Sequence, residues 1–243
     1  MSFLDEIITF AAQNRDAMSI EVMQAIKIDE SFYKVKEVRR LTDETFSLRL
    51  PKSRFTFKAG QHISLGIQGD YQSREYSIYS GENDEHLEVL VKEVKEGYFS
   101  PKLSHLKPGD LVEVNGPFGK FRIDEKKIND HKFVFIASGT GIAPFRSMVR
   151  TYPQLDYQIV HGVRYGHEAY DKDEYEPERH ILCTTGDRSG QVHGRLTKYL
   201  KKTTFDKTTQ FYLCGNSNMI FDALELLKDK GFDRDQIHCE VYF

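Results

Sequence analysis

The chain has 243 residues, 39% of them hydrophobic and 29% charged, with a formal net charge of −3. This is the composition of a water-soluble protein, and it lacks the basic excess that nucleic-acid binding requires, so we expect no nucleic-acid partner. No run approaches the roughly eighteen apolar residues of a membrane span, and the amino terminus has no signal-like pattern. We therefore expect no membrane span, a cytoplasmic location and two domains of ordinary size.

The cysteine and histidine spacings match no common metal framework. The three cysteines stand far apart without a Cys-x-x-Cys pair, which argues against a disulfide framework or an iron-sulfur cluster on this chain. The nine histidines show no His-x-His or His-Glu-x-x-His spacing. We predict no metal site, and any iron-sulfur cluster must then lie on a partner.

Residues 1–30 show helical periodicity, with Phe3, Ile7 and Phe10 on one face and Met18 and Val22 on a further stretch. We expect a helical amino-terminal extension of one or two helices. Two interpretations stand: an amphipathic segment packed on the body of the protein, or an arm for dimerisation or partner docking. The expected oligomeric state is correspondingly a monomer or a dimer.

Residues 31–127 change to short β-rich runs separated by turn residues, at the spacing of an antiparallel β-barrel. The predicted strands are Phe32–Arg40, Thr45–Leu50, His62–Ile67, Tyr76–Ser80, Leu87–Val94 and Leu111–Asn115. A helix interrupts them, because Ser100 offers a capping hydroxyl directly before Pro101, which suits the first helical position. The segment Gly116–Gly119 is interpreted as a structural turn that ends the last strand.

In residues 128–243 apolar strand-like runs alternate with helical ones, which is typical of a doubly wound parallel sheet. The predicted strands are Phe133–Ala137, Tyr157–Val163, Ile181–Thr184, Phe211–Cys214 and Ile237–Phe243. Helices are predicted near Ala143–Thr151, Leu196–Lys201 and Met219–Lys230. On such sheets ligands bind at the carboxyl ends of the strands.

Two motifs in the first half point to a flavin. The segment Arg74–Ser80 matches Arg-x-Tyr-Ser-x-x-Ser at every defined position, and Gly97–Leu103 matches Gly-x-x-Ser-x-x-Leu. With these motifs the chain resembles the ferredoxin-NADP reductase superfamily, and within it the bacterial ferredoxin or flavodoxin reductases. The alternative interpretation makes Tyr76 a core residue and Arg74 a solvated charge, but the two motifs stand in order before a dinucleotide-binding pattern.

A flavin needs a flat aromatic face, a hydrogen-bond partner at N5, and positive or N–H groups for its diphosphate. The resemblance implies FAD, with Tyr76 beside the isoalloxazine, Ser77 at N5 and Arg74 at the pyrophosphate. It also places the start of the Ser100-Pro101 helix at the diphosphate, where free N–H groups favour an anion. Four further residues complete the flavin site that the resemblance implies in this half: Val91, Lys92, Gly97 and Phe99.

A glycine turn follows the first strand of the second half, between Phe133–Ser138 and the helix near Ala143. Glycines let backbone N–H groups approach a phosphate, and the following helix start adds partial positive charge. The turn departs from Gly-x-Gly-x-x-Gly and from the Walker pattern. It resembles the family's Gly-Thr-Gly-Ile-Ala-Pro segment, which implies that Gly139, Thr140, Gly141 and Pro144 cradle the diphosphate of the nicotinamide nucleotide.

Three arginines favour NADPH over NADH. A 2′-phosphate is bound by arginine, whereas a free ribose hydroxyl pair is usually bound by an acid. Arg164 follows a predicted strand in a segment similar to bacterial NADP-dependent members, and Arg195 falls where those members carry a phosphate-binding arginine. Arg188 is a third candidate, although the neighbouring Asp187 would oppose a phosphate. For each arginine alone, a surface charge is the competing interpretation.

The last constellation joins Cys214–Met219 to the carboxyl-terminal strand. The first segment resembles Cys-Gly-x-x-x-Met, which implies that Cys214 positions the nicotinamide carbon and is not a nucleophile. The terminus resembles the Glu-Val-Tyr end of plant-type members, which implies that Glu240 assists hydride transfer and that Tyr242 stacks on the flavin. Phe243 extends one residue beyond that end, so either aromatic is a candidate for the stacking position.

The resemblance covers about Tyr33 to Phe243 and implies a flavoprotein oxidoreductase. Hydride passes between NADPH and FAD, and single electrons pass to or from ferredoxin or flavodoxin, whose acidic surface would face Lys92, Lys95 and Lys102. One alternative is an NADH-dependent reductase component serving an oxygenase or a cytochrome. Another, of a different class, is a non-catalytic flavin-binding subunit of a complex.

Overall fold

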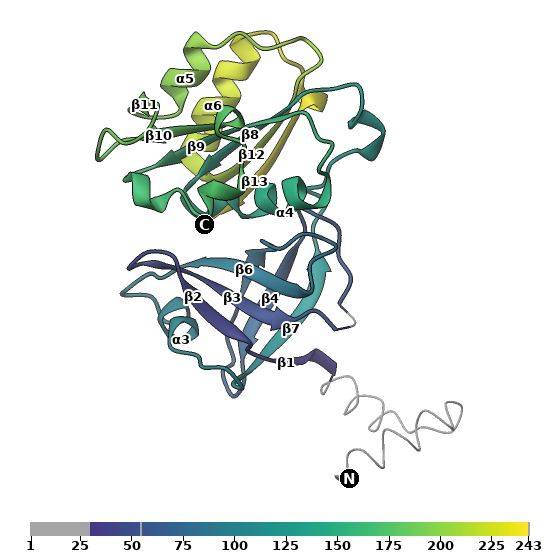
Figure 1. Ribbon diagram of the computed structural model, residues 1–243, viewed down its shortest axis with the longest axis vertical. Coiled ribbons are helices and arrows are strands. Elements are labelled where there is room, and N and C mark those ends of the chain that lie inside the picture. Colours follow the sequence, from purple (N-terminus) through teal and green to yellow (C-terminus); the bar gives the residue numbers. More distant parts are fainter. Residues whose placement is uncertain (1–29, 54, 243) are drawn as a thin grey trace.

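The computed structural model describes residues 30–53 and 55–242 and shows a β-barrel body beside a larger α/β body (Figure 1). The predicted amino-terminal helices and Phe243 lie outside the described residues. The last described residue, Tyr242, packs against the core cluster that the two bodies share. No helix among the described residues is long and apolar enough to cross a membrane.

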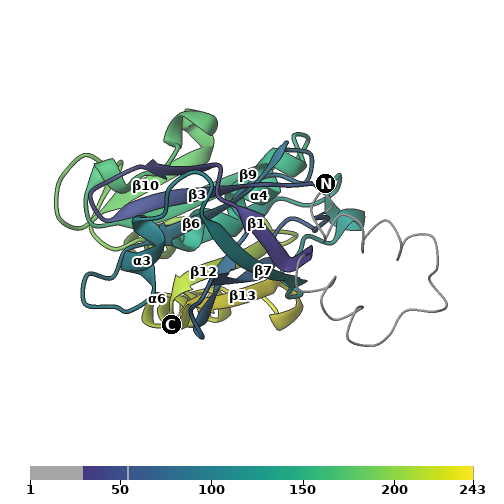
Figure 2. The same cartoon turned by 90° about the horizontal axis from the view of Figure 1, so that it is seen from below.

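Antiparallel strands in two sheets form the barrel body. One sheet has the order β1-β7-β4-β5, from β1 (Phe32–Lys34), β7 (Leu111–Phe118), β4 (His62–Ile67) and β5 (Ser73–Ser77). The other has the order β2-β3-β6, from β2 (Glu37–Arg40), β3 (Thr45–Pro51) and β6 (His86–Lys92). Alternating apolar residues of both sheets point inward and form one core, which includes Phe46, Leu48, Ile63, Leu65, Val89 and Val112. A short helix, α3 (Ser100–Ser104), lies at one end of the barrel (Figure 2).

The second body is a six-stranded parallel sheet of order β11-β10-β9-β8-β12-β13. Its strands are β8 (Phe133–Ser138), β9 (Tyr157–Val163), β10 (His180–Thr184), β11 (Val192–His193), β12 (Gln210–Asn216) and β13 (Ile237–Tyr242). The helices are α4 (Ala143–Thr151), α5 (Thr197–Lys202) and α6 (Ser217–Asp229). The chain leaves β8 toward β11 and returns through β12 on its other side. The switch point, where ligands bind in such sheets, therefore lies between the ends of β8 and β12.

The two bodies share a core and a buried ionic network. Phe121 and Tyr79 from the barrel side pack in one cluster with Phe135 and Phe145 of the α/β body. Asp171, in the β9–β10 connection, accepts hydrogen bonds from both terminal nitrogens of Arg39, at 2.8 and 2.7 Å, and from the Tyr79 hydroxyl at 2.9 Å. These contacts fix the orientation of one body against the other.

Four local expectations were wrong. The strand predicted at Tyr76–Ser80 begins and ends three residues earlier, as β5 (Ser73–Ser77). The predicted strand Phe32–Arg40 is split, because Val35 N–H donates to Asp110 beside β7 whereas Lys36 N–H donates to Arg49 of β3, so the chain changes sheets there. Ser100 does not cap α3: Phe99 holds that position, and the Ser100 hydroxyl accepts from Val94 N–H at 2.9 Å. The strand predicted to end at Asn115 continues as β7 to Phe118, through the first three residues of the predicted turn.

Candidate functional site

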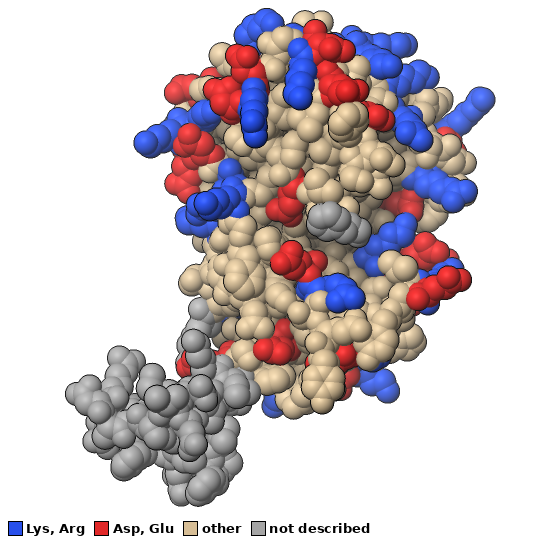
Figure 3. All heavy atoms as spheres, turned by 180° about the vertical axis from the view of Figure 1, so that it is seen from behind, with Lys and Arg blue, Asp and Glu red and all other residues tan. Residues whose placement is uncertain are grey.

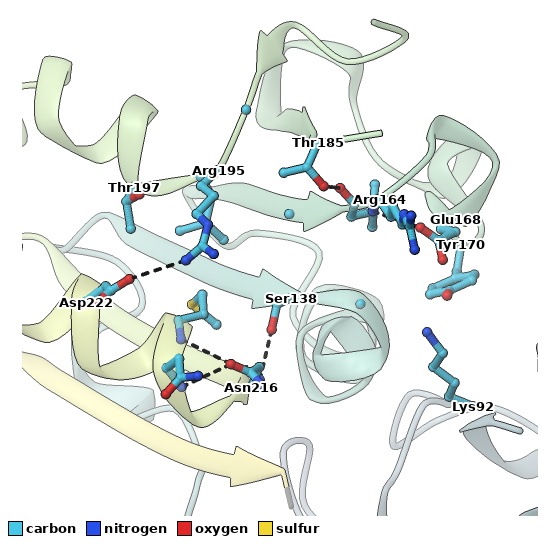
Figure 4. Close-up of a pocket in the computed structure, with 17 residues that line it drawn as sticks. Lys92, Ser138, Arg164, Glu168, Tyr170, Thr185, Arg195, Thr197, Asn216 and Asp222 are labelled. Atoms are coloured by element: carbon cyan, nitrogen blue, oxygen red, sulfur yellow. Dashed lines mark hydrogen bonds and ion pairs between the residues drawn. The ribbon is translucent and has the colours of Figure 1, made fainter. Parts of the chain in front are cut away.

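A cavity of about 320 Å³ opens at the carboxyl edge of the parallel sheet (Figure 4). Its walls come from the ends of β8, β9, β10 and β12 and from the start of α6, which is the switch point of the fold. Two sequence-predicted arginines, Arg164 and Arg195, line it together with Ser138 and Gly139. The topology thus brings together residues that lie 57 positions apart in the chain.

The glycine turn is wedged against the end of β12. A Cβ on Gly141 would lie 2.3 Å from the carbonyl oxygen of Cys214, and one on Gly215 would lie 2.3 Å from Ser138 Oγ, so neither position tolerates a side chain. Gly139 differs, because its φ of +54° requires glycine while the space beyond it is open. Gly139 therefore offers backbone to the cavity, and its open side suits a phosphate cradle.

The arginines approach the cavity from two sides. Arg195 points toward Asp222 at the edge of α6, but the nitrogen–oxygen distance of 3.9 Å makes this a weak ion pair. Arg164 follows β9 and stacks over the Tyr165 ring, with its guanidinium carbon 5.3 Å from the ring centroid. Both guanidinium groups keep donors that no strong partner takes among the residues that the structure describes, so the cavity suits an anion.

Arg188 is not among the residues that line the cavity. The neighbouring Asp187 carboxylate accepts from Gly166 N–H at 2.9 Å and from Ser189 Oγ at 2.7 Å. Hydrogen bonds from Gly166 and Ser189 lower the pKa of Asp187 to about 2. Asp187 therefore organises its own loop, and Arg188 in that loop does not line the cavity as Arg164 and Arg195 do.

Four sequence-predicted residues meet where the bodies join. The Ser77 hydroxyl on β5 donates to Glu240 Oε1 on β13 at 2.6 Å. The Tyr242 hydroxyl lies close enough to Ser77 and to the thiol of Cys214 for both groups to affect its pKa. Parallel pairing places Cys214 directly opposite Glu240 in the sheet. Ser77, Cys214, Glu240 and Tyr242 thus form one cluster built from three distant segments.

Burial changes the pKa values of the Glu240 carboxyl and the Cys214 thiol in this cluster. Burial raises the pKa of Glu240, and the hydrogen bond from Ser77 only partly offsets it. Burial also raises the pKa of the Cys214 thiol well above its ordinary value. Cys214 is therefore a buried thiol that stays protonated near neutral pH, so its role as a positioning contact remains a prediction.

The residues predicted to hold the flavin divide into two groups. Arg74 is exposed, lies over the Phe99 ring at 5.9 Å, and stands two residues before half-buried Tyr76 on β5, so a cation and aromatic faces are close enough for a flavin and its diphosphate. Val91 is different, because its side chain is completely buried in the barrel core. Gly97 is explained by its turn, where a Cβ would lie 2.9 Å from the carbonyl oxygen of Val94.

Lys92 lines the cavity at the carboxyl edge of the parallel sheet, although it belongs to the barrel. In Figure 4 its side chain points from the barrel toward Tyr170 and Glu168. Sequence reasoning placed Lys92 at the flavin and missed Tyr170, Glu168 and Thr185, which also line the cavity. Tyr170, Glu168 and Thr185 come after the carboxyl ends of β9 or β10. Their position after predicted strands could have marked them as site residues, because ligands bind at the strand ends of such sheets. Among residues 30–53 and 55–242 there is no cluster of three metal-ligating side chains.

Comparisons with known proteins agree with this geometry. Residues 32–123 match the oxidoreductase FAD-binding domain family, and residues 135–225 match the oxidoreductase NAD-binding domain family. The flavodoxin/ferredoxin-NADP reductase of Escherichia coli is 28% identical over 214 residues, which cover 78% of this chain and 86% of that protein. The toluate 1,2-dioxygenase electron transfer component of Pseudomonas putida is 25% identical and covers 86% of this chain, but the match spans only 66% of that relative.

A solved structure shows the same fold. The ferredoxin NADP⁺ reductase from Neisseria gonorrhoeae with bound FAD and NADP superposes with a TM-score of 0.79 at 24% identity, covering 87% of this chain and 98% of that one. Fold, site and domain matches together define a two-domain flavoprotein oxidoreductase with an FAD-binding and an NAD(P)-binding part. The chain belongs to the ferredoxin-NADP reductase superfamily.

Proposed function

We propose that this enzyme transfers hydride between NADPH and FAD and passes single electrons to ferredoxin or flavodoxin. The carrying observation is that Arg164 and Arg195 line one cavity at the switch point, opposite a glycine turn with an open backbone. Bound flavin supplies the exchange between two-electron and one-electron chemistry. The arginines bind a 2′-phosphate, and the turn at Gly139 binds the dinucleotide's diphosphate.

The cluster of Ser77, Cys214, Glu240 and Tyr242 at the junction holds a proton near the flavin and keeps water away from it. Ser77 donates its hydroxyl proton to Glu240 Oε1 at 2.6 Å, and burial raises the pKa of Glu240, so this carboxyl takes up a proton more readily than an ordinary glutamate. When Glu240 is protonated, it can donate to Ser77 Oγ, which leaves the Ser77 proton free to face the flavin edge. Tyr242 covers the pair from the carboxyl-terminal strand, and its contact with Cys214 holds the ring in place until a nicotinamide displaces it.

The partner surface needs a revised assignment. Lys95 pairs with Glu44 at 3.1 Å and Lys102 pairs with Asp70 at 2.8 Å, so their charges are already offset, whereas Lys92 belongs to the nucleotide cavity. Acidic and basic side chains are interspersed on the face shown in Figure 3, without a block of either sign. What supports a ferredoxin or flavodoxin partner is the similarity to the Escherichia coli reductase, which matches over most of its length.

A second candidate function is an NADH-dependent electron-transfer component for an oxygenase. It is favoured by the similarity to the Pseudomonas putida protein and by Glu168, a carboxylate at the same cavity. An acid at this edge suits free ribose hydroxyls. Glu168 Oε2, however, already accepts from Arg164 N–H at 2.8 Å and from Tyr165 N–H at 2.9 Å, which ties it to its own turn.

Anaerobic reduction of the FAD-loaded protein by NADPH and by NADH, followed at limiting concentrations, tests the cofactor choice. We expect kcat/KM for NADPH to exceed that for NADH by roughly ten- to a hundredfold, the value of one or two charged hydrogen bonds. R164Q and R195Q should each reduce this preference about tenfold, while the control R188Q leaves it unchanged because Arg188 does not line the cavity. Faster reduction by NADH would refute the proposal in favour of the second candidate.

Electron transfer to the partner is tested separately. The reduced enzyme is mixed with oxidised ferredoxin, with flavodoxin and with a dye acceptor, and the acceptor spectra are followed. We expect rapid one-electron reduction of ferredoxin or flavodoxin. Reduction of the dye with neither protein reduced would remove the partner assignment and leave the hydride transfer intact.

A further inference from the structure

His161 lies on β9 beside the glycine turn and is completely buried. Its Nε2 lies 2.9 Å from the carbonyl oxygen of Gly139. A carbonyl oxygen can only accept a hydrogen bond, so Nε2 carries the proton and donates it. The other ring nitrogen, Nδ1, is buried without a hydrogen-bond partner among the described residues.

The imidazole is held neutral. Burial, with a smaller contribution from neighbouring His180, lowers the pKa of His161 to about 3. The ring also packs beside Tyr170, one of the cavity-lining residues, with centroids 6.2 Å apart. A charged ring would bury an N–H group that has no acceptor, which is costly in an apolar setting. A single neutral tautomer, protonated on Nε2, therefore faces the turn.

The direction of the Gly139 carbonyl fixes the next amide. In a trans peptide the C=O of one residue and the N–H of the next point in opposite directions. Because the Gly139 carbonyl points inward to His161, the Thr140 N–H points away from the buried ring. Glycine at this position has a φ of +54° and free space beyond it, so sterics alone would not prevent the peptide from rotating.

We propose that His161 is a positioning residue for the nicotinamide nucleotide. By holding the Gly139 carbonyl, it fixes the Gly139–Thr140 peptide with its N–H presented to the dinucleotide's diphosphate. The inference rests on the proposed function only in taking the cavity to be the nicotinamide nucleotide site. His161 acts through the backbone and touches no ligand.

Two variants and two ligands test this role. A glutamine at 161 places a side-chain amide N–H near the position of Nε2, whereas an asparagine ends near Nδ1 and cannot reach Gly139. Binding of NADP⁺ and of 2′-AMP, which has no diphosphate, is measured by calorimetry on the FAD-loaded protein. We expect H161N to weaken NADP⁺ roughly five- to tenfold and 2′-AMP less than about twofold, and H161Q to bind both like wild type.

Several results would overturn the proposal. They are equal weakening of NADP⁺ and 2′-AMP by H161N, unchanged NADP⁺ binding in H161N, or loss of FAD and fold in both variants, which would make the ring a structural residue. Nitrogen NMR of wild-type protein at pH 7 gives a check without mutation, since a proton on Nδ1 would also contradict it. If wild type prefers NAD⁺, the cofactor choice fails separately, and the comparison is repeated with NAD⁺ and AMP.

Discussion

Substitution of Glu88 on β6 tests whether the buried ionic network holds the two bodies together. Its side chain is 0% exposed, and Oε1 accepts from Ser47 at 2.6 Å, from Arg49 at 3.0 Å and from Arg39 at 3.2 Å. Oε2 accepts at 3.2 Å from Arg146 of α4, which is only 3% exposed. The E88Q variant keeps one acceptor but turns an amide NH₂ group toward a buried guanidinium.

The expected cost follows from this geometry. Removing one partner of a buried ion pair costs about 3–5 kcal/mol, because the remaining charge stays buried without compensation. Arg146 keeps Glu174 at 2.6 Å as a second partner, so we place E88Q at the lower end, about 3 kcal/mol. For a chain of this size that corresponds to a fall in Tm of about 6–12 °C.

Urea unfolding of FAD-loaded wild type and variant at pH 7 measures this difference. The matched control is E37Q, since Glu37 pairs with the same Arg49 at 2.8 Å but is 48% exposed, and an exposed pair is worth about 1 kcal/mol or less. If E88Q and E37Q lose the same small amount, the ionic network does not hold the bodies together and the reasoning is wrong.

The difference in unfolding free energy between wild type and E88Q should also depend on pH, in a direction set by the pKa of Glu88. Burial acts to raise the pKa of Glu88, but the hydrogen bond from Ser47 and the charges of Arg146, Arg49 and Arg39 outweigh it, so the pKa is lowered. A lowered carboxylate pKa contributes stability above the unfolded-state pKa of about 4.5, which is lost as pH falls through the folded value. The difference from E88Q should therefore shrink below pH 4.5.

Three further predictions concern the sites. S77A should slow flavin reduction by NADPH on the order of a hundredfold with little change in KM, in stopped-flow absorbance. Because burial raises the pKa of Glu240, turnover should show a pH limb above the usual 4.5, and E240Q should lack that limb. K92Q should raise KM for NADPH about two- to fivefold without weakening FAD, whereas K95Q should change neither, since Lys95 lies outside the cavity.

Much of the fold could be predicted because local pattern and burial agree. The bounds of β4, β9 and α4 match the predicted residues, since each segment combines one periodicity with flanking turn or helix-start residues. The short strand β11, only Val192–His193, escaped prediction because two residues cannot display a period. The split at Val35 escaped it because the residues on both sides are strand formers, and only the partner of each N–H changes.

For the site as well, the residues that stand in motifs could be predicted, but the contacts that depend on packing between the two bodies could not. Ser77, Glu240 and Cys214 stand in motifs and were predicted from them, although their meeting depends on two sheets from different bodies. That Lys92 lines the cavity of the α/β body could not be predicted from the sequence, because a barrel residue reaches this cavity only once the bodies are docked.

His161 shows this limit most clearly, since it lies within the correctly predicted strand Tyr157–Val163, yet its contact with Gly139 depends on strand register. Parallel pairing places His161 opposite Ala137, two residues before Gly139. Because side chains alternate along a strand, a slip of one residue would turn the ring to the other face of the sheet and leave the turn without its donor. Register is decided by the packing of the whole sheet, so the residue that holds the Gly139 carbonyl can be identified only from the folded chain.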